Sequence, residues 1–241
     1  MTTIVSAFIS NVNTRKDRTI EKYIEYGKVL LQTKIQKIIF IDEIIFNELK
    51  NYSNELTYLI PIKKESMYLY KYKKLITNYN LNSTLPEKDS FEYMLTMCSK
   101  TEWITKAIEL NYFNSRNFIW IDFGIKHIFN CDDNEFIKKI ENINNKIYKK
   151  IRIGSIWNPN IQYYGDIYKD IQWYFAGGVF GGDIKSLLLF SEKTKEMCIK
   201  IIQEKNTIMW EVNIWYLIYK EIPELFDCYN CDHNSSLVDN Y

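Results

Sequence analysis

Short apolar runs alternate with longer amphipathic stretches through the first half of the chain. Thr3–Ile9, Lys37–Ile41, Leu56–Ile62 and Asn117–Asp122 are rich in β-branched or aromatic residues and are bounded by polar ones. Runs of this length and composition predict buried strands. Within Arg18–Leu31, apolar residues recur at helical spacing, which predicts an amphipathic helix.

A longer helical stretch covers Phe91–Phe113, either as one helix or as two abutting ones. Strand–helix–strand alternation with short connections is typical of a mostly parallel sheet that helices cover on both faces. The first half therefore predicts an α/β fold with a Rossmann-type sheet of the kind that binds nucleotides.

The second half is less regular. Isoleucines at helical spacing predict a helix over Asn134–Ile151, with Asn134 as its N-cap. A strand is expected at Ile151–Trp157, and an aromatic, glycine-rich segment occupies Trp173–Gly182. Asp183 is expected to cap a long helix, and a last buried helix is expected at Trp210–Tyr219.

Composition narrows the function classes. Hydrophobic residues make up 46% and charged residues 25% of the 241 residues, which excludes a disordered or fibrous chain. Lys and Arg number 31 against 30 Asp and Glu and are scattered, which argues against general nucleic-acid binding. Five cysteines, no secretory signal and no long apolar span favour a cytoplasmic protein, at most peripheral to a membrane, with reduced thiols.

The clearest chemical signal is Asp122, which ends the apolar run that begins at Asn117 and lies two residues before Gly124. Open α/β sheets bind ligands at the carboxyl ends of their strands, and a glycine lets the backbone approach a ligand. A carboxylate there suits Mg²⁺ or Mn²⁺ held against a diphosphate. The structural alternative is that Asp122 caps the next helix or bonds loop amides.

Four of the 8 glycines lie within Tyr174–Gly182. Missing side chains let either a ligand or another backbone pass closely, so a ligand-lining segment and a tightly packed strand are both open. The spacing matches neither a dinucleotide fingerprint nor a Walker loop, because no Lys-Ser/Thr follows Gly182.

Two further residues are candidates for chemistry. Glu211 lies in an otherwise apolar helix, where a carboxylate is costly unless it is bonded or working. Glu211 is a candidate general base. The alternative is that its carboxylate only accepts hydrogen bonds from the Asn213 region or from the backbone. His233 lies beside Asp232 and is a candidate late metal ligand, with an ordinary tail histidine as the alternative.

Basic residues near strand ends are candidates for phosphate binding. Arg15 and Arg18 follow the first strand, and a guanidinium there can grip phosphate with two hydrogen bonds. Lys100 interrupts an apolar helical stretch and can act similarly. The alternatives are a solvated helix start for the arginines and a lysine that extends to solvent along its apolar stem.

Taken in order, these segments resemble the bacterial HtrL/YibB family, which is associated with cell-surface polysaccharide biosynthesis and is similar to nucleotide-sugar glycosyltransferases. The likeness spans nearly the whole chain and is carried by Thr3–Phe8, Ser99–Lys100, Phe118–Ile125, Tyr174–Gly182, Trp210–Glu211 and Trp215. The wider resemblance is to the GT-A type. It implies one domain, 1–241, with a nucleotide-sugar half at 1–125 and an acceptor and sugar half at 126–241.

The resemblance implies transfer of a hexosyl group from a nucleoside-diphosphate sugar, with a UDP-sugar favoured, to a hydroxyl of a glycan or surface polysaccharide. It implies Mn²⁺ or Mg²⁺ on Asp122, as the second acid of an Asp-x-Asp motif whose first acid is replaced by Trp120, and on His233. Glu211 would act as base if the reaction inverts, whereas the leaving phosphate itself would deprotonate the acceptor if the reaction retains. Phe8 or a nearby tyrosine would stack on the donor base. The implied donor residues are Phe8, Arg15, Arg18, Lys100, Trp120, Ile121, Asp122 and Gly124, and the implied sugar and acceptor residues are Ala176, Gly177, Gly178, Trp210 and Glu211.

Three other functions compete with this one. A glycoside hydrolase would use Asp122 and Glu211 as two carboxylates flanking a sugar, although the missing export signal counts against it. A non-catalytic sugar- or partner-binding protein is favoured by Trp120 in place of a metal acid. A nucleotidyltransferase would use a similar sheet and metal acids.

Overall fold

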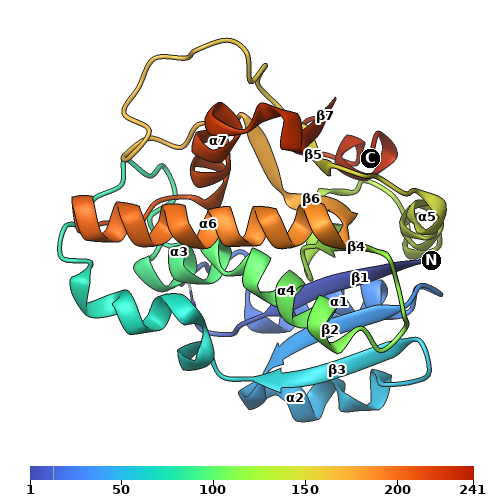
Figure 1. Cartoon of the computed structure of the whole chain (residues 1–241). Coiled ribbons are helices and arrows are strands. Elements are labelled where there is room, and N and C mark those ends of the chain that lie inside the picture. Colours follow the sequence, from blue (N-terminus) through green and yellow to red (C-terminus); the bar gives the residue numbers. More distant parts are fainter. Residues whose placement is uncertain (13) are drawn as a thin grey trace.

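The computed structural model describes residues 1–12 and 14–241, and within them one seven-stranded sheet runs through both halves of the chain (Figure 1). The strand order is β3-β2-β1-β4-β6-β5-β7. Neighbouring strands are parallel except at β6, which runs antiparallel to β4 and β5. The predicted mostly parallel α/β sheet is therefore confirmed. The strands are β1 (Thr2–Phe8), β2 (Lys37–Asp42), β3 (Thr57–Ile62), β4 (Asn117–Ile121), β5 (Ile151–Ser155), β6 (Phe175–Asp183) and β7 (Phe226–Asn230).

Helices cover the sheet on both faces, and in Figure 1 α4 and α6 cross in front of it. Side chains of α3, α4, α6 and α7 belong to the core of that face, whereas α1, α2 and α5 pack on the other. The helices are α1 (Ile20–Leu31), α2 (Glu43–Leu49), α3 (Phe91–Cys98), α4 (Lys100–Leu110), α5 (Asp133–Glu141), α6 (Ile184–Lys205), α7 (Glu211–Glu221) and α8 (Ser236–Asp239).

Alternate residues of the central strands feed two separate cores. Val5 and Trp120 pack toward α4 and α6, whereas their neighbours Ile4 and Ile121 pack toward α1 and α5. All four side chains are almost fully buried. A strand buried on both faces has no polar side, which is why these segments are unbroken apolar runs in the sequence.

The stretch predicted at Phe91–Phe113 forms two abutting helices, α3 and α4. Ser99 lies between them with φ −91° and ψ 1°, outside regular helical geometry. Because the break falls there, α4 begins at Lys100. The side chain of Lys100 therefore projects from a helix start, at the carboxyl edge of the sheet.

The helix predicted over Asn134–Ile151 is wrong in both its cap and its length. Asp132 caps α5 by accepting a hydrogen bond from the Glu135 amide at 2.8 Å. The helix ends at Glu141 and is followed by a 3₁₀ turn over Asn142–Asn145. Asparagine favours turns over helix interiors, and the isoleucine period continued past the helix only because Ile151 begins β5.

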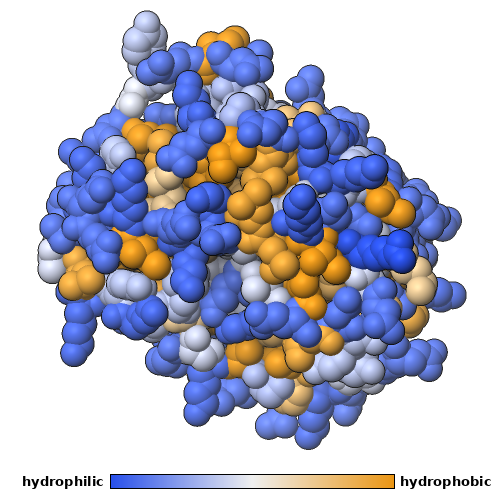
Figure 2. Space-filling view, in the orientation of Figure 1, coloured by the Kyte–Doolittle hydropathy of each residue, from blue (hydrophilic) through white to orange (hydrophobic). Residues whose placement is uncertain are grey.

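The glycine-rich segment forms β6, and the loop before it (gold in Figure 1) rises away from the sheet. Figure 2 shows that the face bearing α6 is mainly hydrophilic, with apolar residues gathered near its middle. Across the described residues, no helix has both the length and the apolar character that a membrane crossing requires.

Candidate active site

A cleft of about 490 Å³ opens at the carboxyl edge of the parallel strands. β1 and β4 are parallel neighbours, so Phe8 and Asp122, at or just after their ends, come to the same edge. The cleft is also lined by Lys100 and Glu211. Its volume is that of a small-molecule site, and its position is where open α/β sheets bind ligands.

Lys100 lies at the floor of the cleft between two carboxylates. Its Nζ is 3.0 Å from Oδ1 of Asp122 and 3.0 Å from Oε1 of Glu211. It also donates a hydrogen bond to the Gly177 carbonyl at 3.0 Å. An ammonium has three donors, so every donor of Lys100 has an acceptor within the protein.

The lysine side chain is only 2% exposed. Burial by itself lowers the pKa of Lys100, but the charges of Asp122 and Glu211 together outweigh it, and the pKa is raised. Lys100 therefore stays an ammonium. The alternative of a lysine that extends to solvent is wrong, because Nζ is bonded to acceptors within the protein.

Asp122 is oriented from two directions. The indole Nε1 of Trp120 donates to its Oδ1 at 2.7 Å, and the Asp122 amide donates to the Gly178 carbonyl at 3.0 Å. Trp120 is buried against Trp103, with the rings stacked at 5.8 Å. Trp120, at the position where the family resemblance implied the first acid of an Asp-x-Asp motif, thus donates a hydrogen bond to Asp122.

Glu211 is the first residue of α7, not an interior helix residue as the sequence suggested. A carboxylate at a helix N-terminus is stabilised by the helix dipole. Lys100, rather than the Asn213 region, satisfies its Oε1. Asn213 instead bonds the loop before β6, through Gln172 and Ile167.

The glycines of β6 differ in what they contact. A β-carbon on Gly177 would lie 2.4 Å from Oε1 of Glu211, whereas one on Gly178 would have nothing nearer than Oδ2 of Asp122 at 3.7 Å. Ala176 and Trp210 also line the cleft. At Gly177 the approaching group is thus a side chain of the protein itself. The tightly packed strand is confirmed at Gly181 and Gly182, where a β-carbon would lie 2.7 Å from the carbonyl oxygens of Phe118 and Lys150.

Basic side chains line the cleft beyond the acids. Arg15 forms an ion pair with Asp17, and Nε of Arg18 lies 4.0 Å from the same carboxylate. Lys88 has a side chain 24% exposed, and burial lowers its pKa while the positive charges of Lys100 and Arg15 act in the same direction. Each of these three cations thus lines the cleft and lies near a carboxylate, Asp17 for the two arginines and Asp89 for Lys88.

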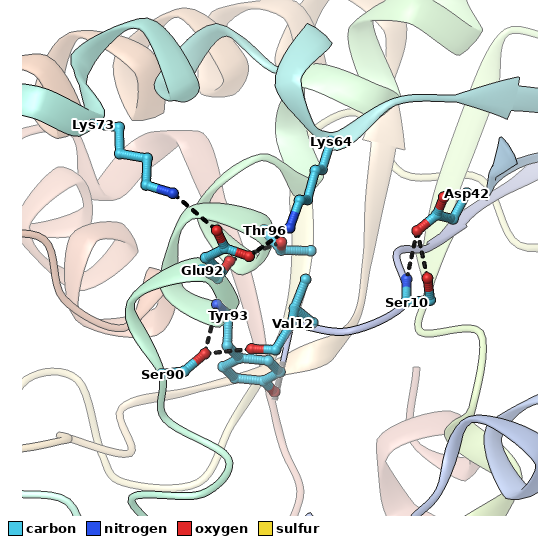
Figure 3. Close-up of polar contacts among 9 residues, drawn as sticks. All are labelled: Ser10, Val12, Asp42, Lys64, Lys73, Ser90, Glu92, Tyr93 and Thr96. Atoms are coloured by element: carbon cyan, nitrogen blue, oxygen red, sulfur yellow. Dashed lines mark hydrogen bonds and ion pairs between the residues drawn. The ribbon is translucent and has the colours of Figure 1, made fainter. Parts of the chain in front are cut away.

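Residues 9–12, which follow β1, line one wall of the cleft, and polar contacts hold Ser10 and Val12 in place (Figure 3). The amide and hydroxyl of Ser10 both donate to Oδ2 of Asp42, at 3.0 and 2.6 Å. Ser90 donates to the Val12 carbonyl and caps α3 by accepting from the Tyr93 amide. Residues 9–12 are thereby tied to both β2 and α3.

Phe8 lines the cleft, but its ring also packs on protein rings. Its centroid lies 5.4 Å from that of Phe123, in a stacked arrangement, and 5.7 Å from that of Tyr23. Gly124 is packed as tightly, since a β-carbon there would lie 2.6 Å from the Tyr23 ring. Ile121, by contrast, is a buried core residue and does not line the cleft.

Asp122 and His233 line the same cleft, yet the donor set does not fit a divalent metal in this arrangement. No group of three His, Cys, Asp or Glu side chains among the described residues is placed to hold a metal ion. Asp122 is already bonded by Trp120 and Lys100. The His233 ring packs edge-on against Trp173 at 4.3 Å, and burial lowers its pKa. The Mn²⁺ or Mg²⁺ site stays a prediction.

Sequence reasoning missed Lys88, Tyr93 and Trp173, which all line the cleft. Lys88 lies in a polar loop with no periodic pattern, and Tyr93 and Trp173 lie in apolar surroundings that resemble ordinary core. Burial, followed by the charges of Glu211 and Asp122, raises the pKa of Tyr93 well above its usual range. No sequence pattern therefore marks any of these three residues as part of a binding cleft.

A model of the bacterial protein family of unknown function HtrL_YibB matches residues 1–236 of the chain. Among proteins with curated descriptions, none matches this sequence.

Two solved structures share a general likeness. One is a glycosyltransferase involved in glycosylation of the major capsid of PBCV-1, at 11% identity and a TM-score of 0.44, over 95% of this chain and 81% of that one. The other is 4-diphosphocytidyl-2C-methyl-D-erythritol synthase from Anaerococcus prevotii, at 9% identity and a TM-score of 0.43, over 96% and 86%.

Proposed function

We propose that this chain, which belongs to the HtrL/YibB family of bacterial proteins, is a glycosyltransferase that moves a hexosyl group from a nucleoside-diphosphate sugar to a hydroxyl of a glycan. The observation that carries the proposal is the cleft at the carboxyl edge of the sheet, with Asp122 and Glu211 paired to Lys100 at its floor and basic residues around them. A diphosphate needs cations, and transfer to a hydroxyl needs a proton acceptor.

The diphosphate is assigned to Arg15, Arg18 and Lys88. All three line the cleft, and guanidinium groups bind phosphate oxygens with paired hydrogen bonds. Lys100 has no donor left for phosphate, because its three hydrogens are bonded within the protein. Charge that develops on the leaving diphosphate is therefore met by the three outer cations.

Glu211 is assigned as the base for an inverting transfer. Among the hydrogen bonds of the described residues, only its Oε1 is engaged, by Lys100. Oε2 is left to accept the proton of the acceptor hydroxyl, while the contact of Oε1 with Lys100 holds the carboxylate in position. The donor would be a UDP-sugar and the acceptor a surface polysaccharide, as the family resemblance implies.

A thermal-stability panel of nucleoside diphosphates and their sugars tests the proposal. Ligand at about 100 times its Kd stabilises the folded chain by roughly 2.7 kcal/mol. One nucleotide should stabilise the wild-type chain more than Lys88→Met, and its sugar should be turned over with release of the diphosphate. A folded chain that no nucleotide stabilises would exclude the transferase.

A non-catalytic sugar-binding protein is the second candidate. The observation that favours it is the ion pairing of Asp122 and Glu211 with Lys100, which also stabilises acids that have no role in catalysis. Binding of the nucleotide sugar without turnover of any glycan acceptor would select it. The hydrolase is disfavoured, because Lys100 fills the space between the two carboxylates that a sugar would need.

A further inference from the structure

Lys100 occupies the place of a cation within the acidic floor of the cleft. Three oxygens surround Nζ at 3.0 Å, from Asp122, Glu211 and the Gly177 carbonyl. Two are carboxylate oxygens and one is a carbonyl oxygen, which are the oxygen types that hard divalent cations bind. We call these three oxygens, from Asp122, Glu211 and Gly177, the oxygen cage. The ammonium of Lys100 lies within it.

Movement of the Lys100 ammonium out of the oxygen cage is energetically unfavourable. Its side chain is 2% exposed, and Nζ lies 5.9 Å above the Trp120 ring. Removing the ammonium would leave the buried Glu211 carboxylate without its cation, beside the like charge of the half-buried Asp122, which is destabilising. A divalent cation beside it would meet a positive charge at a few ångströms in a poorly solvated site.

We propose that Lys100 is the resident cation of this cleft, so that the chain binds a nucleoside diphosphate without a divalent metal. Lys100 is then a positioning residue, which holds Asp122 and Glu211 in place and offsets one of their two negative charges. The identity of the ligand in this inference rests on the proposed function. The occupancy of the oxygen cage by Lys100 is independent of that function.

The charged side chains of the cleft fall into two groups, those at the floor and the cations around them. Asp122 and Glu211 against Lys100 leave one net negative charge at the floor. Arg15, Arg18 and Lys88 add positive charge around it, partly offset by Asp17 and Asp89. Counted together, these side chains carry no net charge, so a diphosphate would be held by hydrogen bonds from the arginines and Lys88 rather than by an excess of fixed positive charge.

Binding of Mn²⁺ alone, followed by electron paramagnetic resonance, tests the occupancy of the cage without any nucleotide. The wild-type chain should show no stoichiometric Mn²⁺ site. Lys100→Ala removes the ammonium and leaves the three oxygens, so it should gain one site that Lys100→Ala/Asp122→Asn lacks. An Asp122-dependent Mn²⁺ site in the wild-type chain would overturn the proposal, and that measurement needs no substitution of Lys100.

The fold of the variants is checked by circular dichroism. If Lys100→Ala does not fold, Lys100→Gln, which keeps a hydrogen-bond donor, takes its place. A folded variant of either kind that gains no Mn²⁺ site would contradict the assignment of a cation cage.

Titration of UDP in the presence of EDTA, and again with Mn²⁺, tests the consequence for the ligand. The two affinities should agree within about twofold, a difference of less than about 0.5 kcal/mol. A tenfold or greater loss in EDTA would overturn the proposal. If neither UDP nor another nucleoside diphosphate binds under either condition, the proposed function fails, whereas the Mn²⁺ result still decides the occupancy of the cage.

Discussion

Gly177 and Glu211 approach so closely that a β-carbon on Gly177 would lie 2.4 Å from Oε1 of Glu211. The same added carbon would lie 3.3 Å from Nζ of Lys100. The carbonyl of Gly177 accepts a hydrogen bond from that ammonium. Gly177 thus contributes to the cluster of Lys100 and Glu211 in two ways. Its carbonyl accepts a hydrogen bond from Lys100, and the absence of a side chain leaves room for Glu211.

Gly177→Ala should displace Glu211 and lower UDP affinity or turnover at least about tenfold, equivalent to about 1.4 kcal/mol. Gly178→Ala is the matched control, because its added carbon meets nothing closer than 3.7 Å. Neither residue has a left-handed backbone, so alanine adds no backbone strain at either position. Equal losses in the two variants, measured by titration and kinetics, would contradict the role of Gly177.

Lys88→Met should weaken nucleoside-diphosphate binding by about tenfold to a hundredfold, because a charged hydrogen bond to phosphate contributes about 1.5–3 kcal/mol. Lys71→Met is the control: Lys71 is an exposed lysine beside the Tyr72 ring and does not line the cleft. Calorimetric titration at two salt concentrations should show a shallower salt dependence for Lys88→Met alone. A loss that is the same in both variants would point to general charge effects instead.

Lys37 provides a pH signature of stability outside the cleft. Its ammonium is buried and donates to the Thr33 and Ile35 carbonyls. Burial lowers its pKa to about 8 from about 10.5, with Glu141 opposing the shift. Between these values the unfolded chain binds the proton and the folded chain does not, so the free energy of unfolding rises with pH.

The expected contribution is about 3 kcal/mol between pH 8 and pH 10.5. Urea unfolding of wild type and Lys37→Met across this window isolates it, because other titrating groups are common to both chains. The free energy of unfolding of wild type should rise relative to that of the variant. Parallel curves would show that Lys37 keeps an ordinary pKa when folded.

Gly27 lies in α1 directly against the Phe123 ring, and a β-carbon there would lie 1.9 Å from it. Alanine in a helix interior normally stabilises by about 1 kcal/mol relative to glycine. Overpacking should reverse that sign here and cost about 1–3 kcal/mol. Thermal unfolding of Gly27→Ala should show the loss, and Phe123→Leu in the same background should recover part of it. A more stable Gly27→Ala chain would refute the contact.

The boundaries of the elements could be predicted where local chemistry decides them. The strand at Asn117–Asp122 and the helix capped by Asp183 lie where the sequence predicted, because burial on both faces and capping are read from neighbouring residues. The helix expected over Asn134–Ile151 was wrong, because an apolar period crossed from a helix into a strand. Periodicity alone does not mark that change.

The α/β class, the strand that ends at Asp122 and the family of the chain could all be predicted from the order of its residues. The shared contacts of Lys100, Asp122 and Glu211 could not, because they arise from the packing of distant segments. Glu211 is 111 positions from Lys100 in the chain, and no local pattern records which buried charges face one another. Burial penalises each charge separately, so the fold is stable only when it brings them together, and that pairing is a property of the packed chain.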